Sequence, residues 1–263
     1  MDSRVFEKFC KLVYEQSGIA LGPNKEALVS ARVGKRMRAL GIADYSQYLS
    51  YVAQDTSGAE LVSLIDAIST NVTSFFREPS HFDFLSEVVS QWFDQGQRRF
   101  RFWSAAASSG EEPYSMAITL LEALRSREAN TRILATDIST KVLDQCREGI
   151  YRADKLDKMP PVLRERYFDR SANGTYTAKS ILKTLILFRR LNLATPPFPM
   201  RGPLDVVFCR NVMIYFDNTV RHGLLNEIHR LLKPGGYLIV GHTESLTGMI
   251  SHFKSVRPSI YIK

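Results

Sequence analysis

Apolar side chains recur at helical spacing through the first 70 residues of the chain. The stripe from Val5 to Val13 predicts one helix, which Gly18 ends. Pro23 begins a second helix, whose apolar positions run from Val29 to Leu40 before Gly41 ends it. Two shorter helices are expected over Tyr45–Tyr51 and Ala59–Ile68. Because this part of the chain shows no strand pattern, we predict a small helical domain over residues 1–70.

From about residue 98 the pattern changes to short apolar runs separated by longer amphipathic stretches. The runs, bounded by small or turn residues, are Phe100–Ala105, Ile133–Ala135, Leu204–Cys209 and Tyr237–Val240. The amphipathic stretches are Pro113–Leu124, Thr140–Cys146 and Asn218–Leu232. Strands that alternate with helices are typical of a parallel sheet covered by helices. The predicted fold class is therefore α/β, with a doubly wound sheet over residues 71–263 after the all-helical domain.

Residues 160–195 depart from this alternation. A helix-like piece at Pro161–Phe168 is followed by Thr175–Thr177 and Leu185–Phe188, two short runs that resemble antiparallel strands. We therefore predict a small antiparallel β insertion within the sheet domain.

Composition and charge narrow the class of protein. The 263 residues are 44% hydrophobic and 24% charged, as in ordinary globular proteins, and no apolar run approaches the roughly 18 residues of a membrane span. The three cysteines are far apart without a CxxC pair, which favours a reduced, cytoplasmic protein over a disulfide framework or zinc site. The net charge of +8 favours an acidic partner, but it does not choose among nucleic acid, anionic lipid and protein.

The first candidate site is the segment Phe102–Ser115, in which a strand leads through small residues into a helix. In doubly wound folds a ligand lies at the carboxyl end of the first strand, where small side chains permit close approach. The dinucleotide fingerprint GxGxxG is absent, because Gly110 is the only glycine in the turn. Glu111 and Glu112 disfavour a pyrophosphate and favour a cation, so the turn suits a nucleoside with a positive group better than NAD. An ordinary strand-to-helix turn explains the pattern about equally well.

Two further strands end in polar side chains. Asp137 follows the second strand, where a carboxylate accepts hydrogen bonds from ribose hydroxyls, although a helix cap is its commoner role. Arg210, Asn211 and Tyr215 follow the buried strand predicted at Leu204–Cys209. Polar groups at the carboxyl ends of strands line the ligand crevice of this architecture. Taken singly, however, Arg210 suits a surface cation and Tyr215 a core aromatic.

The segment Ala67–Pro79 joins the helical part to the sheet. Linkers are usually exposed, but the adjacent Phe75 and Phe76 indicate that this one packs down, as a lid would. The chain contains no P-loop, HExxH or GxSxG motif. Its histidines form no ligand spacing, so no metal is expected; they are His81, His222, His229, His242 and His252.

Taken together, these segments resemble the CheR family of chemotaxis receptor methyltransferases. The matching motifs are Thr70–Glu78, Trp103–Ser115, Thr136–Ile138, Asn192-Leu193, Phe208–Phe216, Lys233–Gly236 and Gly241–Ser245. The resemblance covers nearly the whole chain and implies a cytoplasmic class I methyltransferase with a Rossmann-like sheet. It also implies S-adenosylmethionine as cofactor and S-adenosylhomocysteine as product. The methyl acceptors would be glutamates in the cytoplasmic helical domain of chemoreceptors, whose methyl esters tune chemotactic adaptation.

The resemblance further implies a role for individual residues. The implied cofactor contacts are Asn71, Thr73, Arg77, Glu111, Asp137, Asn192, Leu193, Arg210 and Asn211, with Glu112 as the alternative to Glu111. Arg77 and Tyr215 would also face the substrate and are the catalytic candidates. Because an ionised glutamate is already a nucleophile, no general base is needed. Arg77 would hold a carboxylate oxygen, and Tyr215 would orient one through a hydrogen bond.

The second predicted helix is expected to dock an acidic receptor. Residues 22–42 carry five cations and one acid, a net charge of +4. At 100° per residue, Arg32 and Arg36 share a face away from the centre of the apolar stripe, and Lys35 lies beside them. We assign substrate binding to Arg32, Lys35, Arg36 and Arg38, against the alternative of a merely solvated face. The resemblance implies no nucleic-acid partner and no membrane insertion, and a monomer is expected.

Some members of the family hold a pentapeptide tether at the receptor's C-terminus through the β insertion. Here the span Asp169–Leu191 looks about three residues shorter, near Asn173-Gly174-Thr175, and loop length sets strand register in a hairpin. We therefore predict an enzyme that works without the tether.

Two other functions stay open at this point. A nucleic-acid methyltransferase would suit the basic charge, but Thr195-Pro196-Pro197-Phe198 precedes the fourth strand and lacks the Asp or Asn of the amino-methyltransferase motif. A non-catalytic adaptor that only senses cofactor would keep the fold, but the presence of Arg77 and Tyr215 opposes it.

Overall fold

The computed structural model describes residues 1–22, 25–68, 73–125, 127–246, 248–249 and 252–263. Its N-terminal part is helical, with α1 (Ser3–Ser17), α2 (Glu26–Leu40), α3 (Tyr45–Gln54) and α4 (Ala59–Ile68). The Asp2 side chain caps α1, while Gly18 and Gly41 end α1 and α2 with φ of +72° and +70°. The predicted helical N-terminal part is confirmed, and the predicted helix start at Pro23 lies outside the described residues.

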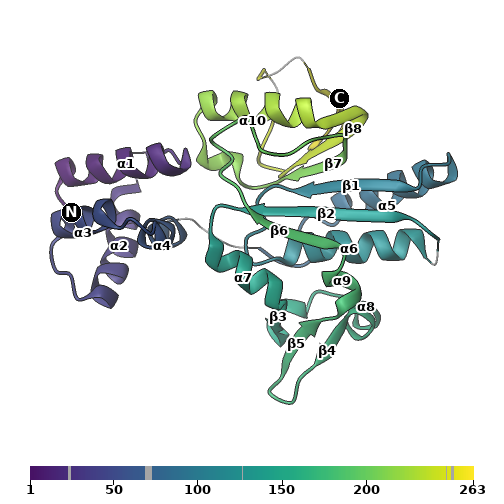
Figure 1. Ribbon diagram of the computed structural model, residues 1–263, viewed down its shortest axis with the longest axis horizontal. Coiled ribbons are helices and arrows are strands. Elements are labelled where there is room, and N and C mark those ends of the chain that lie inside the picture. The colour runs from purple at the N-terminus through teal and green to yellow at the C-terminus, as the bar shows by residue number, and fades with distance from the viewer. Residues whose placement is uncertain (23–24, 69–72, 126, 247, 250–251) are drawn as a thin grey trace.

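A seven-stranded sheet forms the centre of the remaining chain (Figure 1). Its strands are β1 (Arg99–Ser104), β2 (Asn130–Asp137), β6 (Ile186–Arg190), β7 (Leu204–Cys209), β8 (Leu232–Val240), β9 (Lys254–Arg257) and β10 (Ile260–Ile262). They lie in the order β6-β2-β1-β7-β8-β10-β9. The first five in this order are parallel, and the C-terminal pair is antiparallel. The predicted α/β class is therefore correct.

Helices cover both faces of this sheet. Because successive side chains of a strand point to opposite faces, neighbouring residues of one strand belong to different cores. Phe100 and Phe102 share a core with α5 (Ser80–Asp94), α6 (Glu111–Leu124) and α7 (Thr140–Glu148). Trp103 belongs to a second core, together with α10 (Asn218–Leu231) and the N-terminal helices. The sequence patterns predicted α6, α7 and α10 but not α5.

A small three-stranded sheet projects from the main domain (Figure 1). Its strands, β3 (Ile150–Arg152), β5 (Thr175–Ala178) and β4 (Phe168–Arg170), pair antiparallel in that order. The short helices around it are η2 (Ala153–Leu156), α8 (Pro161–Tyr167) and α9 (Ser180–Lys183). The antiparallel insertion is confirmed, and it also takes in β3 from before residue 160.

The predicted antiparallel strand at Leu185–Phe188 was wrong. Residues 186–188 fall in β6, which begins directly after Leu185, pairs in parallel with β2 and forms an edge of the main sheet. Ile186 and Phe188 are buried in the main core, while Leu187 between them is 46% exposed. The short apolar run did indicate a strand, but it did not show which sheet the strand would join.

The N-terminal helices lie against the carboxyl ends of the parallel strands, beside the sheet (Figure 1). Ile19 forms an isolated bridge with Phe216, and the Ala20 N–H donates to the Tyr215 carbonyl oxygen at 2.8 Å. On α4, Asp66 accepts a hydrogen bond of 2.8 Å from the Ser139 hydroxyl. None of the described helices combines the length and apolar character that a membrane crossing requires.

Candidate active site

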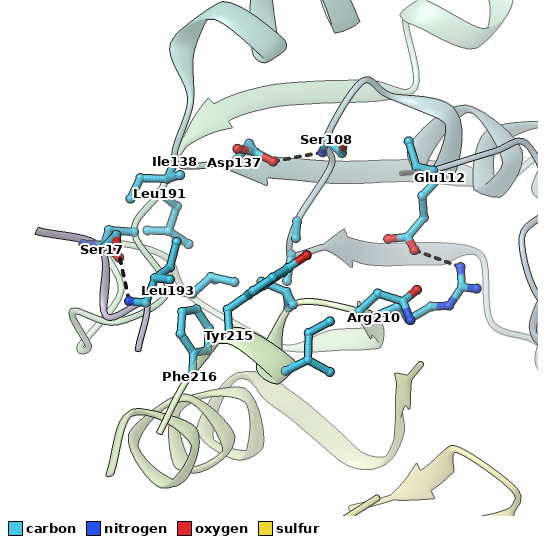
Figure 2. A pocket seen from close by; sticks show the side chains of 18 of the residues that line it. Ser17, Ser108, Glu112, Asp137, Ile138, Leu191, Leu193, Arg210, Tyr215 and Phe216 are labelled. Atoms are coloured by element: carbon cyan, nitrogen blue, oxygen red, sulfur yellow. Dashed lines mark hydrogen bonds and ion pairs between the residues drawn. The ribbon is translucent and has the colours of Figure 1, made fainter. Parts of the chain in front are cut away.

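A pocket of about 280 Å³ lies where the carboxyl ends of β1, β2 and β7 face the N-terminal helices (Figure 2). Ser17 and Ile19 contribute to it from the helical part, and Ala105 and Ala106 from the turn after β1. Small-molecule sites typically enclose about 300–1,000 Å³, so this volume lies just below that range. The pocket occupies the edge at which doubly wound sheets bind ligands.

Asp137 and Ser108 form one wall of the pocket. The Ser108 N–H donates to Asp137 Oδ2 at 2.9 Å, and the Ser139 N–H donates to Oδ1 at 3.0 Å. Burial raises the pKa of Asp137 to about 6, although these N–H groups oppose the shift. Ser108 has a φ of +47°, and its buried hydroxyl has no hydrogen-bond partner among the described residues. The wall therefore offers a carboxylate acceptor and an uncommitted hydroxyl to a ligand.

The opposite wall is an ion cluster centred on Arg210, which is 5% exposed. Its guanidinium binds Glu112 Oε2 at 2.9 Å and Glu78 Oε2 at 3.0 Å. Burial raises the pKa of Glu112 even though Arg210 counteracts it. The cluster contains two carboxyl groups and one cation, so with both carboxylates ionised it favours a positively charged ligand in the pocket.

Arg210 also fixes the backbone turn that carries Arg77. Its Nη2 donates a short hydrogen bond to the Arg77 carbonyl oxygen. The residues on either side of Arg77 have left-handed backbones, with φ of +52° at Phe76 and +59° at Glu78. Non-glycine residues hold such conformations only where surrounding contacts require them. The turn is therefore held in one geometry, and it places Arg77 on the pocket lining.

Tyr215 extends from η3 (Met213–Tyr215) into the pocket, between Asp137 on one side and Arg210 on the other (Figure 2). The buried Glu244 holds the loop that leads to it. Glu244 Oε2 accepts from the N–H groups of Asn211 at 2.6 Å and Gly241 at 2.8 Å. A Cβ at Gly241 would lie 2.3 Å from Asn211 Nδ2, so this packing requires a glycine.

The fold brings most of the predicted site residues into this single pocket. Those on its lining are Thr73, Arg77, Asp137, Asn192, Leu193, Arg210, Asn211 and Tyr215. Of the two neighbouring acids, Glu112 lines the pocket and Glu111 does not. Glu111 is fully buried and instead pairs with Lys155 Nζ at 3.0 Å. Asn71 lies outside the described residues.

The four predicted docking cations of α2 divide into two pairs. Arg32 donates to the carbonyl oxygens of Ala67 and Ile68, and Arg36 binds Glu60 through both carboxylate oxygens at 2.7 and 2.5 Å. Both are only partly exposed and hold α2 to α4. Lys35 and Arg38 are exposed. Of the four predicted docking cations, Lys35 and Arg38 are therefore the two that are accessible to a partner.

Sequence reasoning assigned no role to several residues that shape the site. Glu78 and Glu244 stand in recognised motifs, so the motifs themselves were a signal for them. Ser108 lies in the turn of small residues. It contributes to the site through its left-handed backbone conformation, which the sequence does not reveal. Ser17 and Ile19 reach the pocket only because the helical part folds back onto the sheet.

These features fit the cofactor that the sequence motifs imply. Asp137 and the Ser108 hydroxyl suit ribose hydroxyls, and Glu112 suits a positive group. The small side chains of Ala105 and Ala106 leave room for close approach to the backbone.

Two family models match the chain. The one described as "CheR methyltransferase, SAM binding domain" matches residues 71–262, and the one described as "CheR methyltransferase, all-alpha domain" matches residues 4–69. Three curated relatives carry the name "Chemotaxis protein methyltransferase". The Salmonella typhimurium protein is 39% identical over 259 residues, which cover 97% of this chain and 88% of that protein. The Borreliella burgdorferi and Escherichia coli proteins are each 37% identical, covering 97% of this chain and 93% and 89% of their own lengths.

Proposed function

The chain belongs to the CheR methyltransferase family and is an S-adenosylmethionine-binding enzyme of chemotaxis, and from this premise we propose that it methylates glutamate side chains of chemoreceptors. The methyl acceptors would lie in the cytoplasmic helical domain of the receptor, and the products would be glutamyl methyl esters. In this proposal residues 1–70 dock the receptor and residues 71–263 carry the transfer.

The observation that carries the proposal is the chemical character of the pocket lining. Among the described residues that line it there is no histidine, lysine or cysteine, and its two carboxyl groups are already engaged, Asp137 by backbone N–H groups and Glu112 by Arg210. Hydroxyl, thiol and ammonium acceptors must lose a proton during methyl transfer and usually need a base. A glutamate is already ionised at neutral pH and needs none. A carboxylate acceptor is therefore the one that this pocket serves best.

The bound cofactor supplies a methyl group on a positively charged sulfur, and the protein supplies alignment. Asp137 would accept from the ribose hydroxyls, and Glu112 would attract the positive group. Arg77 would hold one oxygen of the substrate carboxylate, and Tyr215 would donate a hydrogen bond to orient it. Alignment alone can contribute about 7–11 kcal/mol to a reaction of two bound partners.

The exposed cations of α2 would bring the acidic receptor helix to the pocket. Lys25, directly before α2, lies with its Nζ 6.0 Å from the centre of the Tyr215 ring. The beginning of this helix is thus beside the proposed catalytic residue, and Lys35 and Arg38 extend the positive charge along it. Arg32 and Arg36 would support docking indirectly, by holding α2 in place.

We also propose that the enzyme works without a receptor tether. The β4–β5 hairpin closes tightly, with the Ser171 N–H donating to the Thr175 carbonyl oxygen at 2.8 Å and Gly174 at a φ of +79°. A shorter turn re-aims the outer edge of β4, which is the edge that an added peptide strand would join. Calorimetric titration with a receptor C-terminal pentapeptide should show no binding, and micromolar binding would contradict the proposal.

The glutamate assignment is tested by incubating the enzyme with S-adenosylmethionine and a receptor cytoplasmic fragment. Peptide mass mapping should place each added methyl on a glutamate. A fragment with those glutamates changed to glutamine should gain none. Methyl groups on lysine, or on RNA or DNA added in place of receptor, would contradict the assignment.

A further inference from the structure

Three potential metal ligands converge beside the turn that carries Arg77. Glu78 ends that turn, His81 lies in the first turn of α5, and His242 follows β8. Their ligand atoms all lie within 4.8 Å of one another, and the two imidazole rings have centroids 4.9 Å apart. None of the three lines the pocket described above. The sequence spacing had indicated no metal site, because His242 is far from the other two along the chain.

His81 supplies an independent observation that points to a ligand. It is 0% exposed, yet neither ring nitrogen has a hydrogen-bond partner among the described residues. Its Nδ1 lies 3.4 Å from Glu78 Oε2, at the long end of an ion-pair contact and without hydrogen-bond geometry. A buried polar atom left without a partner destabilises the fold, and a bound ion would remove that cost. Burial also lowers the pKa of His81 to about 4, which keeps the imidazole in the neutral form that binds metals.

Glu78 is oriented as a ligating carboxylate usually is. Its Oε2 is 3.0 Å from Arg210 Nη2, whereas Oε1 has a long contact of 3.4 Å with the His242 N–H. Burial disfavours its charge, but Arg210 outweighs burial and lowers the pKa of Glu78 below its usual value. Carboxylates that bind metals commonly have such an outer hydrogen-bond partner. Arg210 thus holds the ionised carboxylate beside His81, whose Nδ1 faces the same oxygen.

We propose that Glu78, His81 and His242 form a binding site for a divalent transition-metal ion, with Zn²⁺ as the best match. Two imidazoles and one carboxylate suit Zn²⁺ better than Mg²⁺ or Ca²⁺, which prefer oxygen ligands. Two ligands at about 2.1 Å from a tetrahedral ion lie about 3.4 Å apart. The ligand atoms that lie furthest apart must therefore approach one another, and His242 is the ligand best placed to move. It is exposed and sits in a turn after the strand, so its side chain is free of the core packing that fixes His81.

The site would couple metal binding to methyl transfer through Arg210. An ion on Glu78 withdraws negative charge from Arg210, which also holds the Arg77 carbonyl oxygen and Glu112. Weakening that ion pair loosens the turn that positions Arg77. We expect bound Zn²⁺ to slow transfer, and this step alone rests on the proposed function.

The site is tested by titrating the metal-free, full-length chain with Zn²⁺ alone and measuring bound ion by equilibrium dialysis. The expected result is saturable binding of one ion per chain. Replacing a ligand with the variant His242→Gln should weaken binding at least about tenfold. Bound Co²⁺ should give the visible absorption of a tetrahedral site in the wild-type chain and lose it in this variant.

Two controls keep the result specific. His222→Gln removes a histidine that hydrogen-bonds carbonyl oxygens elsewhere and should bind Zn²⁺ as the wild type does. His229→Gln/His252→Gln removes a second histidine pair, with ring centroids 5.3 Å apart, and should also keep the binding. Absence of saturable binding, or equal binding by wild type and His242→Gln, would overturn the proposal. Dialysis needs no methyl acceptor, so a chain that binds Zn²⁺ but transfers no methyl would contradict the proposed function and leave the metal site standing.

Discussion

Asp137 shows how one residue's surroundings set the pH range of the site. Its carboxyl has a pKa of about 6 in the folded protein, above the ordinary value of about 3.9. Because the folded-state pKa is raised, protonation of Asp137 stabilises the unliganded fold as the pH falls through about 6 towards 4. Ribose hydroxyls need the ionised carboxylate as acceptor. Cofactor affinity should therefore change with pH in the direction opposite to this stability contribution.

We predict that S-adenosylhomocysteine binds more weakly as the pH falls below about 6, by up to about tenfold per pH unit. Asp137→Asn should bind about tenfold to a hundredfold more weakly than wild type near neutral pH and should show a flatter pH profile. Calorimetry across this range measures both effects. A variant with the affinity and the pH profile of the wild type would contradict the role of Asp137.

Arg77 and Tyr215 should differ in how much their loss slows the reaction. Arg77→Ala removes a charged contact to the substrate carboxylate, and we predict a rate loss of about a hundredfold or more. Tyr215→Phe removes one neutral hydrogen bond and should cost about tenfold. Single-turnover transfer to a receptor fragment measures both, with circular dichroism to confirm folding. An Arg77→Ala enzyme with wild-type activity would disprove the proposed contact.

For single residues, the sequence predicted which side chains would gather at the pocket, but it did not predict which partner each side chain would contact. Polar residues that follow buried strands had to meet at one edge, and Asp137, Arg210 and Tyr215 do. The sequence did not show which of Glu111 and Glu112 would line the pocket. Adjacent residues on a helix point about 100° apart, so a helix that begins at Glu111 turns that side chain to Lys155 and its neighbour to the pocket.

Among the elements, α2 shows that a helical wheel gives the faces of a helix but not the helices that pack against them. The wheel placed Arg32 and Arg36 together on one face, but it did not reveal that α4 lies beside that face. Glu60 on α4 accepts hydrogen bonds from Arg36 and also from Tyr48, so the three side chains form a buried link within the helical part. Likewise, the short apolar run Leu185–Phe188 indicated a strand but not its partner, since pairing depends on distant residues.

We predict that Lys35→Glu/Arg38→Glu raises the Michaelis constant for receptor, because both cations are exposed on α2. The effect should shrink as salt is added, and cofactor affinity should stay unchanged. The matched control is Arg201→Glu/Lys254→Glu, which reverses two exposed cations on the sheet domain. Equal receptor kinetics for both double variants would show that α2 is only a solvated surface.

In the molecule as a whole, the pocket that we propose for the cofactor is shared between the helical part and the sheet. The Asn192 side chain donates to the Gln16 carbonyl oxygen at 3.0 Å, and the Tyr14 hydroxyl donates to Asp217 at 2.6 Å. Gly18 lies at this junction. The recurrence of apolar residues predicted each domain separately, but a contact between domains has no periodic pattern, and so the sequence did not predict this wall of the pocket.

We predict that Gly18→Ala lowers both stability and cofactor affinity. Gly18 has a φ of +72°, and an added Cβ would lie 2.3 Å from the Ala194 Cβ. Overpacking of this kind costs about 1–3 kcal/mol, to which the left-handed backbone adds strain. Gly22→Ala is the matched control, because no atom of the described residues lies within 4 Å of its added Cβ. Denaturant unfolding and calorimetry measure the two effects, and identical behaviour of the two variants would contradict the shared pocket.

We propose above all that this pocket transfers a methyl group to a receptor carboxylate. The decisive measurement is the volatile methanol released by mild base after incubation with methyl-labelled S-adenosylmethionine and a receptor fragment, since methyl esters hydrolyse and methylated amines do not. We predict base-labile label with the wild-type enzyme and little with Arg77→Ala. Label that stays on the receptor after base treatment, or equal release by both enzymes, would contradict it.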